Sequence, residues 1–125
     1  MKPASSLPGR TWLAAALFMA AVVHPARADT LTTPSFVIQI EEHCEEGVVG
    51  CDDVSYRGTH RKTGQGIALR GRTLHTLCAD GVTPCRFLGY EFRNGAVRYV
   101  VLEDGTLTVT QVRKVLLEES GEWDH

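Results

Sequence analysis

The chain has 125 residues, 43% of them hydrophobic, and a formal net charge of −2 at neutral pH. The length suits one domain, and the negative charge argues against general nucleic-acid binding. Four cysteines, an even number, point to a disulfide framework if the chain is exported.

Residues 1–28 have the pattern of a secretory signal peptide. Two basic residues, Lys2 and Arg10, precede an apolar run over 12–23, and Ala26-Arg27-Ala28 is a small-x-small cleavage site. The run is too short for a membrane span. We therefore predict cleavage after Ala28 and a soluble periplasmic or secreted product, a single β domain over 29–125. Loss of the leader's three basic residues leaves that domain with a net charge of −5.

The first predicted strand lies in PSFVIQIEEH, after an irregular start over 29–33. Phe36, Ile38 and Ile40 alternate with outward positions, which gives one buried face. The segment 41–53 that follows carries six carboxylates and no Lys or Arg, so we interpret it as a solvated loop. It lacks the D-x-D-x-D-G spacing of a calcium loop.

The cysteines occur in CEEGVVGC and CADGVTPC, two C-x6-C loops with turn residues inside. These spacings favour local pairs, Cys44 with Cys51 and Cys78 with Cys85, among the three connectivities that four cysteines allow. A four-thiolate zinc site is the alternative, although structural zinc sites normally have shorter spacings.

A hairpin is predicted where DVSYRGTHR and QGIALRGRTLHTL flank a Gly-rich turn. With Gly64-Gln65 as the loop, Arg57 lies directly opposite Arg72, and a bulge is expected near Gly71. The apolar face then carries Tyr56, His60, Ile67 and Leu69, and the opposite face carries Arg57, Arg61, Arg70 and Arg72.

The next segment predicts a three-stranded meander. Asn94-Gly95 indicates a two-residue type I′ turn, which sets Phe92 opposite Val97 and Glu91 opposite Arg98. The following turn, 103–105, is predicted to have three residues, with Gly105 in the left-handed region and Leu107 opposite Val101.

A last strand, KVLLEE, is predicted after a turn over 111–114, and Trp123 in the polar tail is expected to cover one end of the sheet. The predicted fold is therefore all-β, with about seven antiparallel strands in a meander, closed as a small barrel or folded as a sandwich and stapled by disulfides.

The chain contains no nucleophile elbow, phosphate loop or histidine metal motif, so we predict neither an enzyme nor a metal or other cofactor. The candidate binding residues are Arg57, Arg61, Arg70 and Arg72, because guanidinium groups suit carboxylates and phosphates. Their partner is expected to be an acidic protein or an anionic envelope ligand. The alternative is that these arginines pair with the acidic loop, in a structural or stress-protective protein without a specific ligand.

The run over 56–123, with YRGTHRKTGQGIALRG, HTLCADGVTPCRFLGYEFRNG, YVVLEDGTLTV and KVLLEESGEW, resembles a group of small, uncharacterised exported proteins of Gram-negative bacteria. That resemblance implies export and no particular activity. More loosely, the size, export, cysteines and meander are similar to those of periplasmic inhibitors of c-type lysozyme, which implies an inhibitor-like binding module. The string nearest to the inhibitors' small-residue loop is SGEW at 120–123, and no inhibitory residue is carried over from it.

Overall fold

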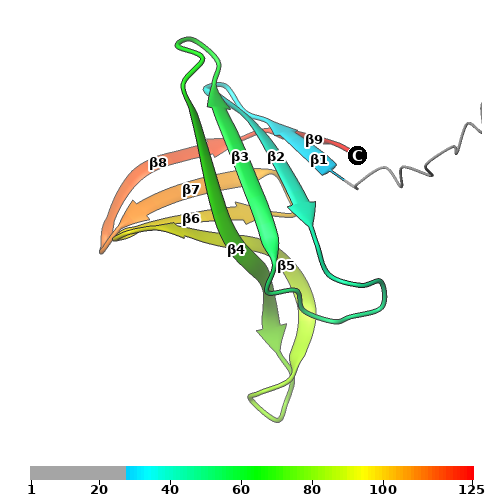
Figure 1. The fold of residues 1–125 in the computed structure, drawn as a ribbon. Coiled ribbons are helices and arrows are strands. Elements are labelled where there is room, and N and C mark those ends of the chain that lie inside the picture. Colours follow the sequence, from blue (N-terminus) through cyan, green and yellow to red (C-terminus); the bar gives the residue numbers. More distant parts are fainter. Residues whose placement is uncertain (1–27) are drawn as a thin grey trace, which may run out of the picture.

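The computed structural model describes residues 28–125, which form nine β-strands (Figure 1). The strands are β1 (Ala28–Thr32), β2 (Phe36–Glu42), β3 (Val54–His60), β4 (Gly66–Leu77), β5 (Pro84–Asn94), β6 (Val97–Leu102), β7 (Thr106–Gln111), β8 (Lys114–Ser120) and β9 (Glu122–Asp124). All belong to one antiparallel sheet in the order β8-β7-β6-β5-β4-β3-β2-β1-β9. The all-β prediction is confirmed. The strand count is nine rather than about seven, because the segments expected to be an irregular start and a polar tail are β1 and β9.

The predicted leader, apart from Ala28, lies outside the described residues. Within 28–125, no helix has the length and apolar character needed to cross a membrane.

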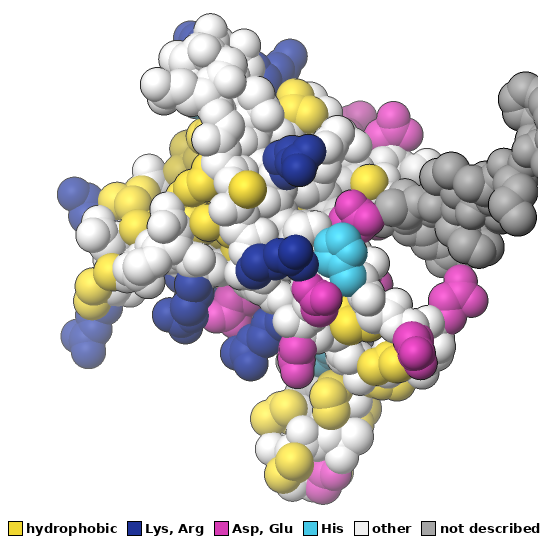
Figure 2. All heavy atoms as spheres, in the orientation of Figure 1, with side chains coloured by type: hydrophobic (Ala, Val, Ile, Leu, Met, Phe, Trp, Pro, Cys, Tyr) yellow, Lys and Arg dark blue, Asp and Glu magenta, His cyan; other side chains and the backbone are white. Residues whose placement is uncertain are grey.

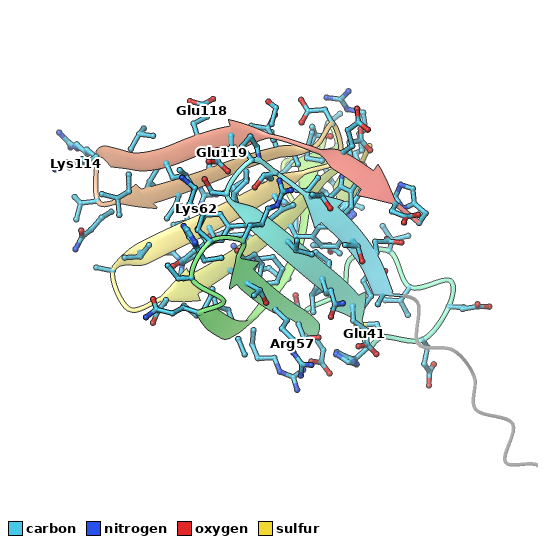
Figure 3. The ribbon with its side chains drawn as sticks, turned by 90° about the horizontal axis from the view of Figure 1, so that it is seen from above. Glu41, Arg57, Lys62, Lys114, Glu118 and Glu119 are labelled. Atoms are coloured by element: carbon cyan, nitrogen blue, oxygen red, sulfur yellow. A yellow bond between two sulfur atoms is a disulfide. The ribbon has the colours of Figure 1, made fainter. Side chains whose placement is uncertain are left out.

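The sheet curls into a nearly closed barrel because one stretch of chain joins its two edges. β8 pairs with β7 and β9 pairs with β1, and only Gly121 separates β8 from β9. Glu119 points inward from β8, whereas Glu118 points outward (Figure 3). The Glu119 carboxylate accepts hydrogen bonds from Ser35 N at 3.1 Å and Ser35 Oγ at 2.5 Å. These bonds connect β8 to the turn between β1 and β2.

The core fills the inside of this barrel with residues from both crossing halves of the sheet. Ile38, Tyr56 and Phe92 are among its largest fully buried side chains, and the rings of Tyr56 and Phe92 lie 5.1 Å apart. Burial raises the pKa of the Tyr56 hydroxyl well above its usual value, and Tyr99 adds to the effect. The predicted apolar face of the first strand is confirmed for Ile38 and Ile40, and Phe36 is half-buried.

The tail of the chain contributes to the core through Trp123. This residue pairs with Leu31 in the β1–β9 ladder, and its Nε1 donates a hydrogen bond to the Leu102 carbonyl at 3.3 Å. Trp123 is half-buried against the core cluster. It therefore covers apolar residues as predicted, but from within a strand and not from a loose tail.

Two turn predictions in the meander had opposite outcomes. The three-residue turn is confirmed, since Leu107 pairs with Val101 and Gly105 has φ of +96°. The Asn94-Gly95 turn is wrong: Asn94 pairs with Val97 and belongs to β5, and the loop is Gly95-Ala96. A type I′ turn requires positive φ at both central residues, whereas Gly95 has φ of +61° and Asn94 is not in that region.

The predicted pairing in the meander is consequently shifted by two residues. Phe92 lies opposite Tyr99, and Glu91 lies opposite Val100 rather than Arg98. A shift of two preserves which side chains face the core, so the buried face was predicted correctly although the pairs were not. Glu91 still reaches Arg98 diagonally across the strands, with Oε1 3.1 Å from Nε.

The predicted register of the β3–β4 hairpin is also wrong. Arg57 lies opposite Ala68, and Arg72 pairs instead with Glu91 on β5. The loop is longer than two residues. The His60 N–H donates to the Gln65 carbonyl, and the His60 carbonyl accepts a hydrogen bond from the Gly64 N–H. This register keeps Arg57 and Arg72 apart, which avoids the repulsion of like charges directly opposite each other.

The expected bulge is displaced along β4. Register shifts occur at Leu74/His75 and between His75 and Leu77, rather than at Gly71. Gly71 has a different role, since a Cβ there would lie 2.0 Å from the Glu91 carbonyl oxygen. The glycine therefore permits the close approach of β4 to β5.

Both predicted disulfides are present, Cys44–Cys51 and Cys78–Cys85, and no cysteine within 28–125 is free. The thiolate zinc alternative is therefore excluded for this oxidised state, because all four ligand sulphurs are in disulfides. The first bond closes the acidic loop between β2 and β3, and the second closes the loop between β4 and β5.

Candidate functional site

Five arginines lie on the outside of four neighbouring strands. Each occupies a position that alternates with core residues such as Tyr56, Leu69, Phe92 and Tyr99, so its side chain faces solvent. Dark blue side chains gather on this side of the molecule, with acidic groups between them (Figure 2). The set, here called the arginine face, comprises Arg57 of β3, Arg70 and Arg72 of β4, Arg93 of β5 and Arg98 of β6.

One half of the arginine face is built around Glu91. The side chain of Glu91 is only 6% exposed, and its carboxylate contacts Arg98 Nε at 3.1 Å, Arg93 Nη2 at 3.2 Å and Arg72 Nη2 at 3.5 Å. The hydrogen bond from Arg98 and the three positive charges lower the pKa of Glu91 against the opposing effect of burial. One carboxylate thus neutralises one of three charges, which leaves N–H donors of the exposed guanidinium groups directed to solvent.

The other half of the arginine face borders a surface concavity of about 500 Å³. Arg57, Arg70, His43 and Ser55 contribute to its lining. Arg57 points away from the barrel (Figure 3), and it makes no ion pair with any residue of 28–125. Its guanidinium is therefore available to a ligand in the concavity.

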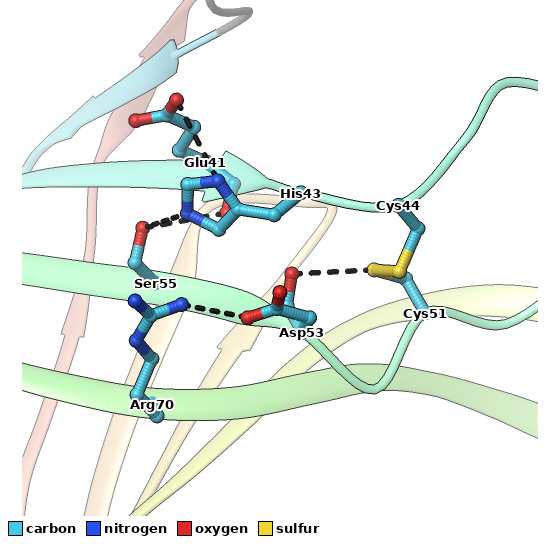
Figure 4. A network of polar contacts seen from close by, with 7 residues as sticks. All are labelled: Glu41, His43, Cys44, Cys51, Asp53, Ser55 and Arg70. Atoms are coloured by element: carbon cyan, nitrogen blue, oxygen red, sulfur yellow. Dashed lines mark hydrogen bonds and ion pairs between the residues drawn. A yellow bond between two sulfur atoms is a disulfide. The ribbon is translucent and has the colours of Figure 1, made fainter.

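Polar contacts hold the remaining groups of this concavity in place (Figure 4). Arg70 Nη1 lies 2.6 Å from Asp53 Oδ1, and His43 Nε2 is hydrogen-bonded to Ser55 Oγ at 2.8 Å. The backbone N–H of His43 donates to the Asp53 carbonyl at 2.9 Å, which fixes the base of the loop between β2 and β3 that the Cys44–Cys51 disulfide closes. Both imidazole and hydroxyl are thus positioned beside the two arginines.

Glu41, His43 and Ser55 have the carboxylate–imidazole–hydroxyl order of a hydrolase triad. However, His43 Nδ1 lies 3.8 Å from Glu41 Oε1, which is too long for a hydrogen bond that would orient the ring. The Ser55 hydroxyl also lies 3.5 Å from the Glu41 carbonyl oxygen, an acceptor that competes with the imidazole for its proton. The ring thus lacks the carboxylate hydrogen bond that orients the base of a hydrolase triad, and the Glu41, His43 and Ser55 side chains form part of the polar lining of the concavity.

The structure brings together three of the four predicted site residues, Arg57, Arg70 and Arg72, and separates the fourth. Arg61 lies in the turn after β3, where Nη1 donates to the carbonyls of Thr33 at 3.0 Å and Pro34 at 3.4 Å. These bonds tie the β3–β4 turn to the β1–β2 turn. Arg61 therefore differs from Arg70 and Arg72, which contact carboxylates, because its guanidinium joins two turns through backbone carbonyls.

Sequence reasoning missed Arg93 and Arg98. Both flank the turn at 95–96, and alternation with Phe92 and Tyr99 already directed them outward. What the sequence did not reveal was the β4–β5 pairing, which sets Glu91 beside Arg72 and joins the two hairpins into one surface. Arg70 pairs with a residue of the acidic segment, Asp53.

No protein-family model, curated protein or solved structure matches the chain. Within 28–125, no group of three or more His, Cys, Asp or Glu side chains is arranged to hold a metal ion. The arginine face presents guanidinium groups at the surface, with a hydroxyl and an imidazole beside two of them, and guanidinium groups are chemically suited to carboxylates and phosphates.

Proposed function

We propose that the protein is an exported, non-enzymatic binding module that receives an anionic ligand or an acidic partner protein on the arginine face. The observation that carries the proposal is the imbalance of charge there: five arginines lie beside three carboxylates, of which Asp53 and Glu91 pair with arginines and Glu41 lies beside His43. Export is supported by the leader pattern and by the two disulfides, which are typical of oxidising compartments.

Arg57 and Arg93 are the residues on which binding depends most. Arg57 has no ion-pair partner within 28–125, and Arg93 shares the single Glu91 carboxylate with two other arginines. Arg57 thus has no internal carboxylate and Arg93 has only a shared one, and a carboxylate or phosphate of the partner would accept hydrogen bonds from both. The concavity beside Arg57 would also select the ligand group by its size and shape.

The test uses a fluorescent oligoglutamate peptide and inorganic polyphosphate as probes, with affinity measured by anisotropy at low ionic strength. We expect Arg57→Gln with Arg93→Gln to weaken binding by about tenfold, which corresponds to ~1.4 kcal/mol. The matched control is Lys114→Gln, which removes a charge from an exposed position at the start of β8 that is not part of the arginine face. This control is expected to change the affinity little.

Two results would contradict the proposal. If Lys114→Gln weakens binding as much as the double variant does, the probe responds to overall charge and not to the arginine face. If neither probe binds the wild-type protein, the face does not recognise these anions. The melting temperature of the double variant is measured alongside, since a large decrease would assign its effect to stability.

A structural role without a specific ligand is the second candidate, and one observation favours it. Arg70, Arg72, Arg93 and Arg98 all have ion-pair partners inside the protein. Under this alternative, Arg93→Gln lowers stability and the wild-type protein captures neither an acidic probe nor a partner from periplasmic extract. The two candidates therefore differ in both measurements.

A further inference from the structure

The barrel has an open end beside the loop that the Cys44–Cys51 disulfide closes, and this end forms a cleft of about 1130 Å³. Here it is called the barrel mouth; its lining includes Asp29, Glu42, Glu45, His75, Phe87 and Tyr90. The loop between β2 and β3 and the far end of the β4–β5 hairpin project on the same side of the sheet (Figure 1). The barrel mouth is separate from the arginine face, since its strand residues occupy inward positions.

The inward positions change character at this end of the barrel. Leu31 and Ile40 are fully buried, but the next inward positions on the same strands are Asp29 and Glu42. An inward carboxylate at a strand end marks a place where the barrel stops being a packed core and becomes a polar opening. Barrel mouths are a common location of ligand sites.

The barrel mouth combines carboxylates with an aromatic wall. Phe87 lies between His75, at 5.5 Å, and Tyr90, at 5.3 Å, measured between ring centroids. Burial, followed by the negative charges of Glu42 and Asp29, raises the pKa of the Tyr90 hydroxyl. Both carboxylates thus act electrostatically on the same aromatic group.

The barrel mouth carries negative charge. Among the described residues, its lining contains the carboxylates of Asp29, Glu42, Glu45 and Glu46 and no Lys or Arg. Asp29 contacts His125 Nδ1 at 3.1 Å, whereas Glu42 makes no ion pair with any residue of 28–125. A cation beside an aromatic face gains from the ring quadrupole as well as from the carboxylate.

The loop between β2 and β3 also lines the barrel mouth, and covalent and hydrogen bonds hold it in place. The Cys44–Cys51 disulfide closes the loop, and the Cys51 N–H donates to Thr73 Oγ1 at 2.8 Å. The Thr73 N–H in turn donates to the Cys51 carbonyl at 2.8 Å. At its outer edge the loop carries Val48 and Val49, which are 54% and 67% exposed.

We propose that the barrel mouth binds a basic segment of a partner protein, with a lysine or arginine side chain entering between Glu42 and the Phe87–Tyr90 pair. A volume of about 1130 Å³ lies above the usual range of small-molecule pockets, roughly 300–1,000 Å³, and accommodates several neighbouring side chains. The exposed valines provide apolar contact for the residues that flank the inserted cation. The site is opposite in charge to the arginine face and does not depend on the function proposed for it.

The test measures binding of a short capped oligolysine peptide by isothermal titration calorimetry, and the site is located from amide chemical shifts. We expect Glu42→Gln to weaken binding by about tenfold and Phe87→Leu by about threefold. The matched control is Glu118→Gln, which removes a carboxylate from an exposed position on the outside of β8 (Figure 3). This control should retain nearly wild-type affinity.

Three results would overturn the inference. These are equal weakening by Glu118→Gln, amide shifts confined to residues outside the barrel mouth, and binding of butylammonium as tight as that of oligolysine, which would identify a small-cation site instead. An oligoglutamate peptide is not expected to perturb the barrel mouth. Since the arginine face is tested with anions and its own variants, failure of one proposal is distinguishable from failure of the other.

Discussion

Replacing Glu91 with glutamine should destabilise the protein although the side chain keeps its shape. Glu91→Gln removes the only carboxylate that contacts Arg72, Arg93 and Arg98 within 28–125. The three guanidinium groups would then lie close together without a counter-charge. Because Glu91 is nearly fully buried, water does not reach this position to solvate the guanidinium groups in place of the carboxylate.

The size of the effect follows from the exposure of the three partners. Arg72 and Arg93 are 61% and 66% exposed and can regain water, so each contact is comparable to a surface ion pair of ~0–1 kcal/mol. Arg98 is 41% exposed and makes the shortest contact, a charge-assisted hydrogen bond of ~1.5–3 kcal/mol. Relief of the cost of burying a charge offsets part of the loss. We therefore expect a net loss of about 2 kcal/mol, or roughly 8–16 °C in melting temperature for a domain of this size.

The assay is thermal unfolding of both proteins at several pH values. The pKa of Glu91 is lowered in the folded state, so its stabilisation is complete above the pKa of the unfolded chain and is lost as pH falls through the folded pKa. The difference between wild type and variant should thus be full at neutral pH and shrink below about pH 4.3. Added salt should stabilise the variant more than the wild type, because it screens the exposed guanidinium groups. Equal melting temperatures at neutral pH, or a difference that persists in acid, would refute this reasoning.

Two further changes test the close packing of the sheet and the disulfide loops by urea denaturation. Gly71→Ala should lower the free energy of unfolding by about 3 kcal/mol or more, because the new Cβ would meet the Glu91 carbonyl oxygen. Gly64 has φ of +74° and open space around it, so Gly64→Ala should lower the free energy of unfolding by only about 1 kcal/mol. Equal losses for the two variants would exclude the proposed clash. Replacing either the Cys44–Cys51 or the Cys78–Cys85 pair by serines should cost about 2.5 kcal/mol, since both bonds span a sequence separation of 7. Only loss of the first should also weaken oligolysine binding, and identical binding by both variants would count against a role for that loop.

The fold class, the disulfides and the buried faces were predictable because they depend on alternation and on local spacing. Alternation identified Ile38, Ile40 and Leu107 as inward positions, and C-x6-C spacing identified both cysteine pairs. These features survive an error in strand register by an even number of residues. Both register errors were of this kind, by two residues in the meander and by four in the β3–β4 hairpin.

The site was less predictable because it depends on which strands are neighbours. The Arg57–Arg72 pair was expected from a hairpin considered alone, and the structure replaces it with the pairing of Arg72 and Glu91 between hairpins. Nothing local to 94–97 distinguished a type I′ turn at Asn94-Gly95 from the observed loop. The carboxylates of 41–53 are exposed as predicted, apart from the half-buried Glu41, but the sequence did not reveal that curvature of the sheet places Glu42 and Glu45 at a cleft.

The fold and the arginine face share one structural requirement, the close approach of β4 to β5 at Gly71. A Cβ there would meet the Glu91 carbonyl and the Phe92 ring, so glycine permits the pairing of Gly71 with Phe92 and of Arg72 with Glu91 in the next position. The first pair lies over the core and the second lies on the arginine face. A change that separates these strands should therefore loosen the aromatic core and also displace the arginines. Effects on binding are consequently separated from effects on stability most cleanly at positions such as Arg57, which makes no contact within this junction.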